Sequence, residues 1–184
     1  MRRRAAARAL AAGFLLCAAT PPIVFVPVEP RLAGAAAEYR RIWEADGERI
    51  VAALEAASGL AFPEAGIDAI VTAGRPMTAF DGRSIRLRAD YSPEYKRATL
   101  VHELGHRLAL TLGTGTGLDD HRLLYLFLYD AWADLWGRDF ADRMAAIERR
   151  IPGADDYDAA WSWALAMTRE ERRARLRALA APRP

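Results

Sequence analysis

Two histidines and a glutamate occur together in the segment His102-Glu-Leu-Gly-His106. On a helix, residues four positions apart project from the same face, so both imidazole rings can reach one ion. Two imidazoles at this spacing suit a tetrahedral Zn²⁺. Glu103 lies about 100° around the helix from His102, where it can reach a water molecule beside the ion without binding the ion itself. We therefore expect His102 and His106 to bind Zn²⁺ and Glu103 to act as the general base toward that water.

The alternative is that the two histidines are incidental residues on an exposed amphipathic helix. The surrounding sequence argues against this, because Leu100, Leu104 and Leu108 leave little of the helix free to face solvent. Polar groups inside an apolar helix are costly unless they are paired or bind a metal. The pattern therefore favours a metal site.

A catalytic zinc site needs a third protein ligand and an open position. In the metzincin pattern a third histidine stands six residues after the second, but here that position holds Leu112. The metzincin pattern therefore does not apply. The next histidine along the chain, His121, opens a strongly apolar segment that continues to residue 137.

That apolar segment predicts a buried helix over residues 120–136, with Asp130 and Asp134 on one face. Two buried carboxylates repel each other unless a cation or a histidine partners them. A metal held by two histidines would supply both, so the two aspartates are candidates for the metal site. The alternative is that they cap neighbouring helices.

The motif HELGH, followed further along by DAWADLWG, resembles the gluzincin branch of the zincin metallopeptidases. Members place a glutamate ligand on a second helix, often with an aspartate four residues later that orients a ligand histidine. Related forms occur in the CAAX-prenyl-protease type and in thermolysin-like enzymes. The resemblance implies Asp130 as the third zinc ligand and Asp134 as the residue that orients a histidine. Aspartate is shorter than the usual glutamate, so the second helix must approach closely, which Gly105, Ala131 and Ala133 permit.

The resemblance implies zinc-dependent hydrolysis of peptide bonds in a peptide or protein substrate, with Glu103 as base. The oxyanion needs a further donor, and the candidates are His121, Tyr129 and Tyr157. We select His121, whose alternative role is that of a helix N-terminal residue bonded to Asp119. The alternative function is a non-catalytic, zinc-bearing module for binding or assembly in the cell envelope. The motif argues against it, because a structural zinc does not need Glu103.

The remaining pattern predicts an α+β fold: a compact, zincin-like domain that is mostly helical, with a small β-sheet packed on the HELGH helix. Helices are expected over 38–58, from Ser92-Pro93 to Leu112, and over 120–136, 139–151, 155–167 and 168–180; strands are expected over 67–73 and in a hairpin arm at 78–89. The strand at 83–89 is expected to be an edge that pairs with an extended substrate. The alternative is that this strand is an ordinary solvent-exposed edge, whose arginines disfavour pairing with another strand.

The first 28 residues are expected to be a signal peptide or an N-terminal anchor, followed by a single zincin-like domain over 29–184. Residues 1–8 carry four arginines, and residues 9–19 are apolar and uncharged. Cleavage after Ala19 and retention of a span over 9–28 both remain open. Either outcome predicts an exported protein, periplasmic or extracellular, that meets the membrane only through this segment. Cys17 is the only cysteine, so its removal would leave neither a disulfide nor a thiol nucleophile.

The composition narrows the function classes further. With 184 residues, 52% of them hydrophobic and 27% charged, the chain is neither wholly disordered nor a polytopic membrane protein. A net charge of +2 gives no large excess of positive charge for binding nucleic acid. The many arginines and alanines beside a single lysine, Lys96, are typical of a GC-rich bacterial genome.

Overall fold

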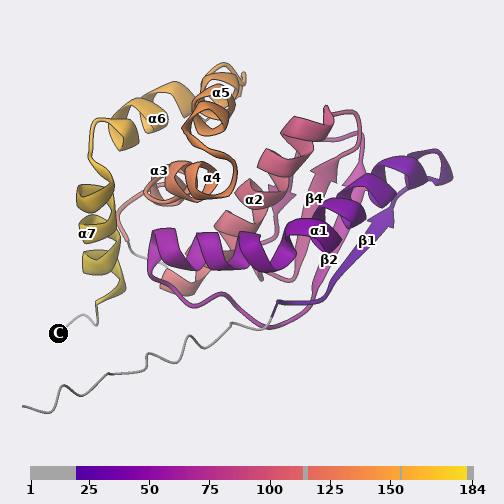
Figure 1. Cartoon of the computed structure of the whole chain (residues 1–184), viewed down its shortest axis with the longest axis horizontal. Coiled ribbons are helices and arrows are strands. Elements are labelled where there is room, and N and C mark those ends of the chain that lie inside the picture. Colours follow the sequence, from indigo (N-terminus) through magenta and orange to yellow (C-terminus); the bar gives the residue numbers. More distant parts are fainter. Residues whose placement is uncertain (1–19, 114–115, 154, 182–184) are drawn as a thin grey trace, which may run out of the picture.

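The structure, a computed structural model, describes residues 20–113, 116–153 and 155–181. Within these ranges the chain forms a four-stranded sheet and seven α-helices, which confirms the predicted α+β class. The sheet lies on one side of helices α1 (Ala33–Ser58) and α2 (Pro93–Ala109), and the later helices gather on the other side (Figure 1). The two long helices therefore form a middle layer with apolar contacts on both faces.

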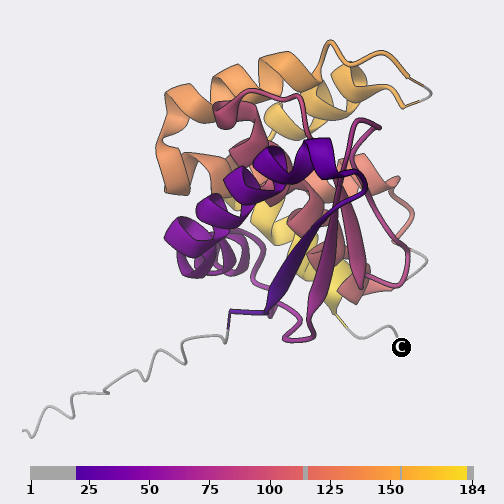
Figure 2. The same cartoon turned by 90° about the vertical axis from the view of Figure 1, so that its right-hand side faces the viewer.

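The sheet has the strand order β1-β2-β4-β3. Strands β1 (Ile23–Pro27), β2 (Ile67–Thr72) and β4 (Ser84–Arg88) are parallel, and the short β3 (Met77–Thr78) runs antiparallel to β4. Figure 2 shows the three longer strands side by side. Alternate residues of β2 and β4 are buried, as a sheet with one face on the helices requires.

The predicted hairpin around Asp81-Gly82 is confirmed, but the predicted edge strand at 83–89 is wrong. β4 lies inside the sheet, between β2 and β3, so both of its sides are already paired. The free edge beside α2 belongs to β3. The error arose because a two-residue strand has too little sequence to show alternation.

The folded domain begins earlier than the predicted boundary after residue 28. β1 pairs with β2 from Ile23 opposite Ile67 to Pro27 opposite Val71, and Phe25 is buried in the core. A membrane span over 9–28 does not fit this pairing, because residues 23–27 are part of the sheet. The predicted signal over residues 1–19 lies outside the described residues. In the described ranges no helix is long and apolar enough to cross a membrane.

Helix α2 carries the HELGH motif and begins as predicted. The Ser92 hydroxyl accepts a hydrogen bond from the backbone N–H of Tyr95, and Pro93 occupies the first helical position. The helix continues as a 3-10 turn over Leu110–Leu112. From Ala98 to Ala109 almost every residue is buried, because the sheet, α1 and the later helices surround this helix.

The single helix predicted over 120–136 is wrong. The chain forms α3 (Asp120–Tyr125) and α4 (Leu128–Trp136), separated by a break at Phe127, whose φ is −141°. The apolar residues through the break are fully buried, because α3 packs on α2 and α6 whereas α4 packs on α1 and α5. The break therefore lets one apolar segment fill two parts of the core.

The C-terminal helices follow the prediction more closely. They are α5 (Arg138–Glu148), α6 (Tyr157–Leu165) and α7 (Arg169–Ala180). The capping box of α7 forms as expected, with reciprocal bonds between Thr168 and Glu171. Trp161 of α6 is fully buried, and Trp163 packs at the margin of the core.

Candidate metal centre

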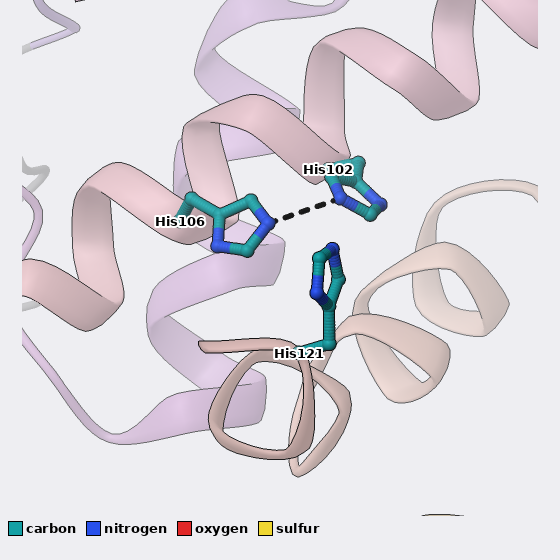
Figure 3. Close-up of side chains that lie close together, drawn as sticks. All are labelled: His102, His106 and His121. Carbon is teal, nitrogen blue, oxygen red and sulfur yellow. Dashed lines mark hydrogen bonds between the residues drawn. The ribbon is translucent and has the colours of Figure 1, made fainter. Parts of the chain in front are cut away.

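Three histidines from two helices meet at one point. His102 and His106 project from α2, and His121 reaches them from the first turn of α3 (Figure 3). One ring nitrogen from each lies within 4.8 Å of the other two, and the Nε2 atoms of His102 and His106 are 3.1 Å apart. The three side chains therefore lie close enough together to bind a metal ion.

Helix α3 is brought to α2 by a cap and by a close contact. Asp119 accepts a hydrogen bond from the backbone N–H of Arg122 and so begins the helix directly before His121. Leu124 of α3 then packs against Gly105 of α2. A Cβ on Gly105 would lie 2.5 Å from the Leu124 Cδ1 atom, so only glycine allows this approach without a shift. The glycine inside the HELGH motif thus helps to bring His121 to the cluster.

A buried glutamate, Glu148 at the end of α5, holds the outer nitrogen of His102. Its Oε1 atom lies 2.7 Å from His102 Nδ1, and its Oε2 atom accepts hydrogen bonds from Tyr125 Oη at 3.0 Å and Trp161 Nε1 at 3.1 Å. With Nδ1 as donor to Glu148, the His102 Nε2 atom is left to face the cluster. The sequence analysis missed this residue.

The electrostatic environment shifts the pKa values of the three histidines in different directions. Burial lowers the pKa of His102, but the charge of Glu148 and its hydrogen bond outweigh burial, so the pKa of His102 is raised. Burial lowers the pKa of His106 well below its ordinary value, and the charge of His102 lowers it further. Burial and His102 also lower the pKa of His121. His106 and His121 are therefore held in the neutral form that ligates metals.

Glu103 follows His102 on α2 and faces the edge of the sheet. Its side chain is 3% exposed, and its Oε2 atom accepts a hydrogen bond from the Thr78 hydroxyl at 2.7 Å. Burial raises the pKa of Glu103. A carboxylate with a raised pKa is a better proton acceptor near neutral pH than an exposed one.

The two aspartates predicted for the metal site lie elsewhere. Asp130 forms a two-point ion pair with Arg172 of α7, with Oδ1 2.6 Å from Nη2 and Oδ2 3.1 Å from Nε, and both side chains are buried. Asp134 is exposed and binds Arg169 with both oxygens. The prediction of Asp130 as the third ligand is therefore wrong, because its carboxylate is taken by Arg172. The prediction that Asp134 orients a histidine is wrong as well, since Glu148 makes that contact.

The three residues predicted as candidate oxyanion donors have different surroundings in the structure. His121 lies with His102 and His106, close enough to bind a metal ion together with them, so its geometry fits a ligand position rather than the predicted oxyanion donor. The Tyr129 hydroxyl donates to Asp142 at 2.7 Å. The Tyr157 ring packs against the His121 ring, with 4.5 Å between centroids. Of the two tyrosines, Tyr157 is the one beside the cluster.

A hollow of about 300 Å³ includes His121 in its lining. Its walls come from the first turns of α3 and α6 and the chain before α6: Asp119, His121, Arg122, Asp155, Asp156 and Ala160. Of the three histidines, His121 is the one that lines this hollow, whereas His102 is buried in α2.

Comparisons with protein-family models, curated proteins and solved structures gave no match for this chain. A function for this chain is therefore inferred from the geometry of the site.

Proposed function

We propose that this protein is a zinc-dependent metallopeptidase. The observation that carries the proposal is the convergence of His102, His106 and His121, with Glu103 adjacent in the same helix. A structural metal site needs ligands but no neighbouring carboxylate base. A hydrolytic site needs both, and Glu103 stands on the same buried helix as two of the three histidines.

The ligand set favours zinc over other ions. Three imidazoles with one remaining position form the ligand set of a catalytic tetrahedral zinc site. Oxygen-preferring ions such as Mg²⁺ and Ca²⁺ are disfavoured, because the cluster offers nitrogen atoms. The contact of His102 with Glu148 adds the outer carboxylate that commonly orients a zinc-binding histidine.

In the proposed reaction, zinc held by His102, His106 and His121 would supply Lewis acidity toward the scissile carbonyl group and the attacking water. Glu103 accepts a proton from the attacking water as the water oxygen bonds to the carbonyl carbon. Glu103 then gives this proton to the amine nitrogen as the carbon–nitrogen bond breaks, so its carboxylate is regenerated. Tyr157 is the candidate donor to the oxyanion, because its ring packs on His121.

The test is cleavage of a mixed peptide library by the zinc-loaded protein, with and without a chelator. Glu103→Gln should keep its zinc but lose about 10²–10⁴-fold in rate, because an amide cannot take a proton from water. Glu94→Gln is the matched control, since Glu94 is exposed on the same helix and binds Arg143. Activity of Glu103→Gln within a few-fold of wild type would overturn the mechanism. A zinc-bound wild type that cleaves no peptide would favour the non-catalytic envelope module instead.

A further inference from the structure

The hydroxyl group of Thr78 touches Glu103 at two atoms. Thr78 Oγ1 lies 2.7 Å from the Glu103 Oε2 atom and 2.9 Å from the main-chain carbonyl oxygen of the same residue. Thr78 belongs to β3, and Glu103 lies 25 residues later in α2. Among the hydrogen bonds of the described residues, Thr78 provides the one that reaches the Glu103 carboxylate.

The position of Thr78 is fixed from two directions. In the sheet it stands opposite Ile85 of β4, whose side chain is buried in the core. One turn of α2 after Glu103, the guanidinium of Arg107 donates to the carbonyl oxygen of Gly82 at 2.7 Å and so ties down the hairpin turn. The β3–β4 hairpin is therefore attached to α2 at two points, Thr78 to Glu103 and Gly82 to Arg107. The two points are four residues apart in the hairpin and four residues apart in the helix.

A hydroxyl group has one hydrogen to donate and lone pairs that accept. Thr78 Oγ1 is within hydrogen-bond distance of both the Oε2 atom and the main-chain carbonyl oxygen of Glu103, so the hydroxyl group links the carboxyl group to its own backbone.

We propose that Thr78 is a positioning residue that holds the Glu103 carboxyl group in one place through these two contacts. The inference deepens the proposed peptidase function and depends on it for its catalytic consequence. Because β3 is the free edge of the sheet beside α2, Thr78 also links the base to the edge strand. A general base must stay within hydrogen-bond reach of the proton it moves, and this contact supplies that constraint.

The experiment compares Thr78→Val, which removes the hydroxyl but keeps the branched shape, with Thr78→Ser, which keeps the hydroxyl. Thr72→Val is the matched control, because Thr72 lies in β2 and its hydroxyl accepts from the backbone N–H of Gly74. Zinc content, thermal unfolding, kcat and KM are measured for each full-length protein. A readout independent of activity is the carboxyl carbon-13 NMR resonance of Glu103 in the metal-free protein, identified by its absence in Glu103→Gln.

Thr78→Val should lower kcat per bound zinc by about 10–100-fold, a part of the roughly 10²–10⁴-fold that general-base catalysis contributes. KM should change little, Thr78→Ser should recover most of the loss, and Thr72→Val should match wild type. The Glu103 resonance should shift or broaden in Thr78→Val and return in Thr78→Ser.

An unshifted resonance in Thr78→Val overturns the positioning role. So does a fall in kcat that only follows lost zinc or lost folding, because that is what a purely structural threonine would give. If the wild type cleaves no peptide, the proposed function fails, and the resonance alone then decides whether Thr78 holds Glu103.

Discussion

Asp130→Asn is expected to destabilise the fold while leaving the metal-binding cluster intact. Asp130 and Arg172 are 4% and 5% exposed, and they are joined at two points. Removing one partner of a buried pair costs about 3–5 kcal/mol, because the other charge is left uncompensated. Asparagine keeps the shape and one acceptor, so we expect the lower end, about 3 kcal/mol, or about 6–12 °C in melting temperature.

His121→Ala is expected to show the opposite behaviour. His121 is half-buried at the start of α3, and its ring nitrogen is one of the three that converge. Losing a ligand should weaken zinc binding by more than the roughly 10–100-fold that loss of an outer partner costs. The fold should be affected less than in Asp130→Asn, since no buried ion pair is broken.

The assay measures zinc per protein by mass spectrometry after dialysis, together with thermal unfolding of the metal-free forms. The double variant Asp130→Asn with Arg172→Met serves as the control for the ion pair, because it leaves no unpaired buried charge and should recover part of the lost stability. If Asp130→Asn lost its zinc at an unchanged melting temperature while His121→Ala kept zinc, the assignment of the third ligand would be refuted.

Three further predictions concern the outer carboxylate, pH and export. Glu148→Gln should weaken zinc binding by about 10–100-fold, measured by competition with a chelating dye, and an unchanged affinity would contradict the orienting role. In the metal-free protein the pKa of His102 is raised above its ordinary value of 6.5. The pairing of protonated His102 with Glu148 therefore stabilises the fold fully below pH 6.5. This stabilisation is lost as the pH rises through the raised pKa of His102. Between about pH 6 and about pH 8, the wild type should therefore lose stability as the pH rises, and Glu148→Gln should lack this loss. The same pH dependence of unfolding in both proteins would contradict the pairing. A reporter fused after residue 37 should appear outside the cytoplasm and stay inside when Arg2, Arg3 and Arg4 are changed to glutamate. A cytosolic reporter on the native N-terminus would reject export.

The parts of the fold that the sequence predicted well are those set by local chemistry. The cap at Ser92, the turn at Asp81-Gly82 and the capping box at Thr168 depend on residues within a few positions of each other, and all three form. The pairing of His102 with His106 also depends only on helical spacing. Each of these features can be recognised without knowing where any other element packs.

The sequence did not identify Glu148 as the partner of His102 or Arg172 as the partner of Asp130, because both partners come from distant helices. Both nevertheless stand at positions where the helical periodicity predicts a buried residue. Glu148 continues the buried positions Ala141, Met144 and Ala145 of α5 at helical spacing, so a carboxylate stands on an apolar face. Arg172 likewise shares the buried face of α7 with Leu176. A charged residue at such a position needs a partner. The sequence shows that need but does not identify the partner, because the order in which helices pack is set by the whole core.

The choice between His121 and Asp130 illustrates how one break decides the site. They are nine positions apart, and at about 100° per residue a straight helix would place them on opposite faces. A single unbroken helix could therefore offer only one of them to the histidines of α2. The break at Phe127 gives each residue its own helix, so that α3 takes His121 to the cluster while α4 takes Asp130 to Arg172. A buried carboxylate already neutralised by a guanidinium gains little from a metal, whereas His121 is held neutral beside two other imidazoles by its lowered pKa. The ion pair in the C-terminal core thus leaves His121, and not Asp130, beside His102 and His106.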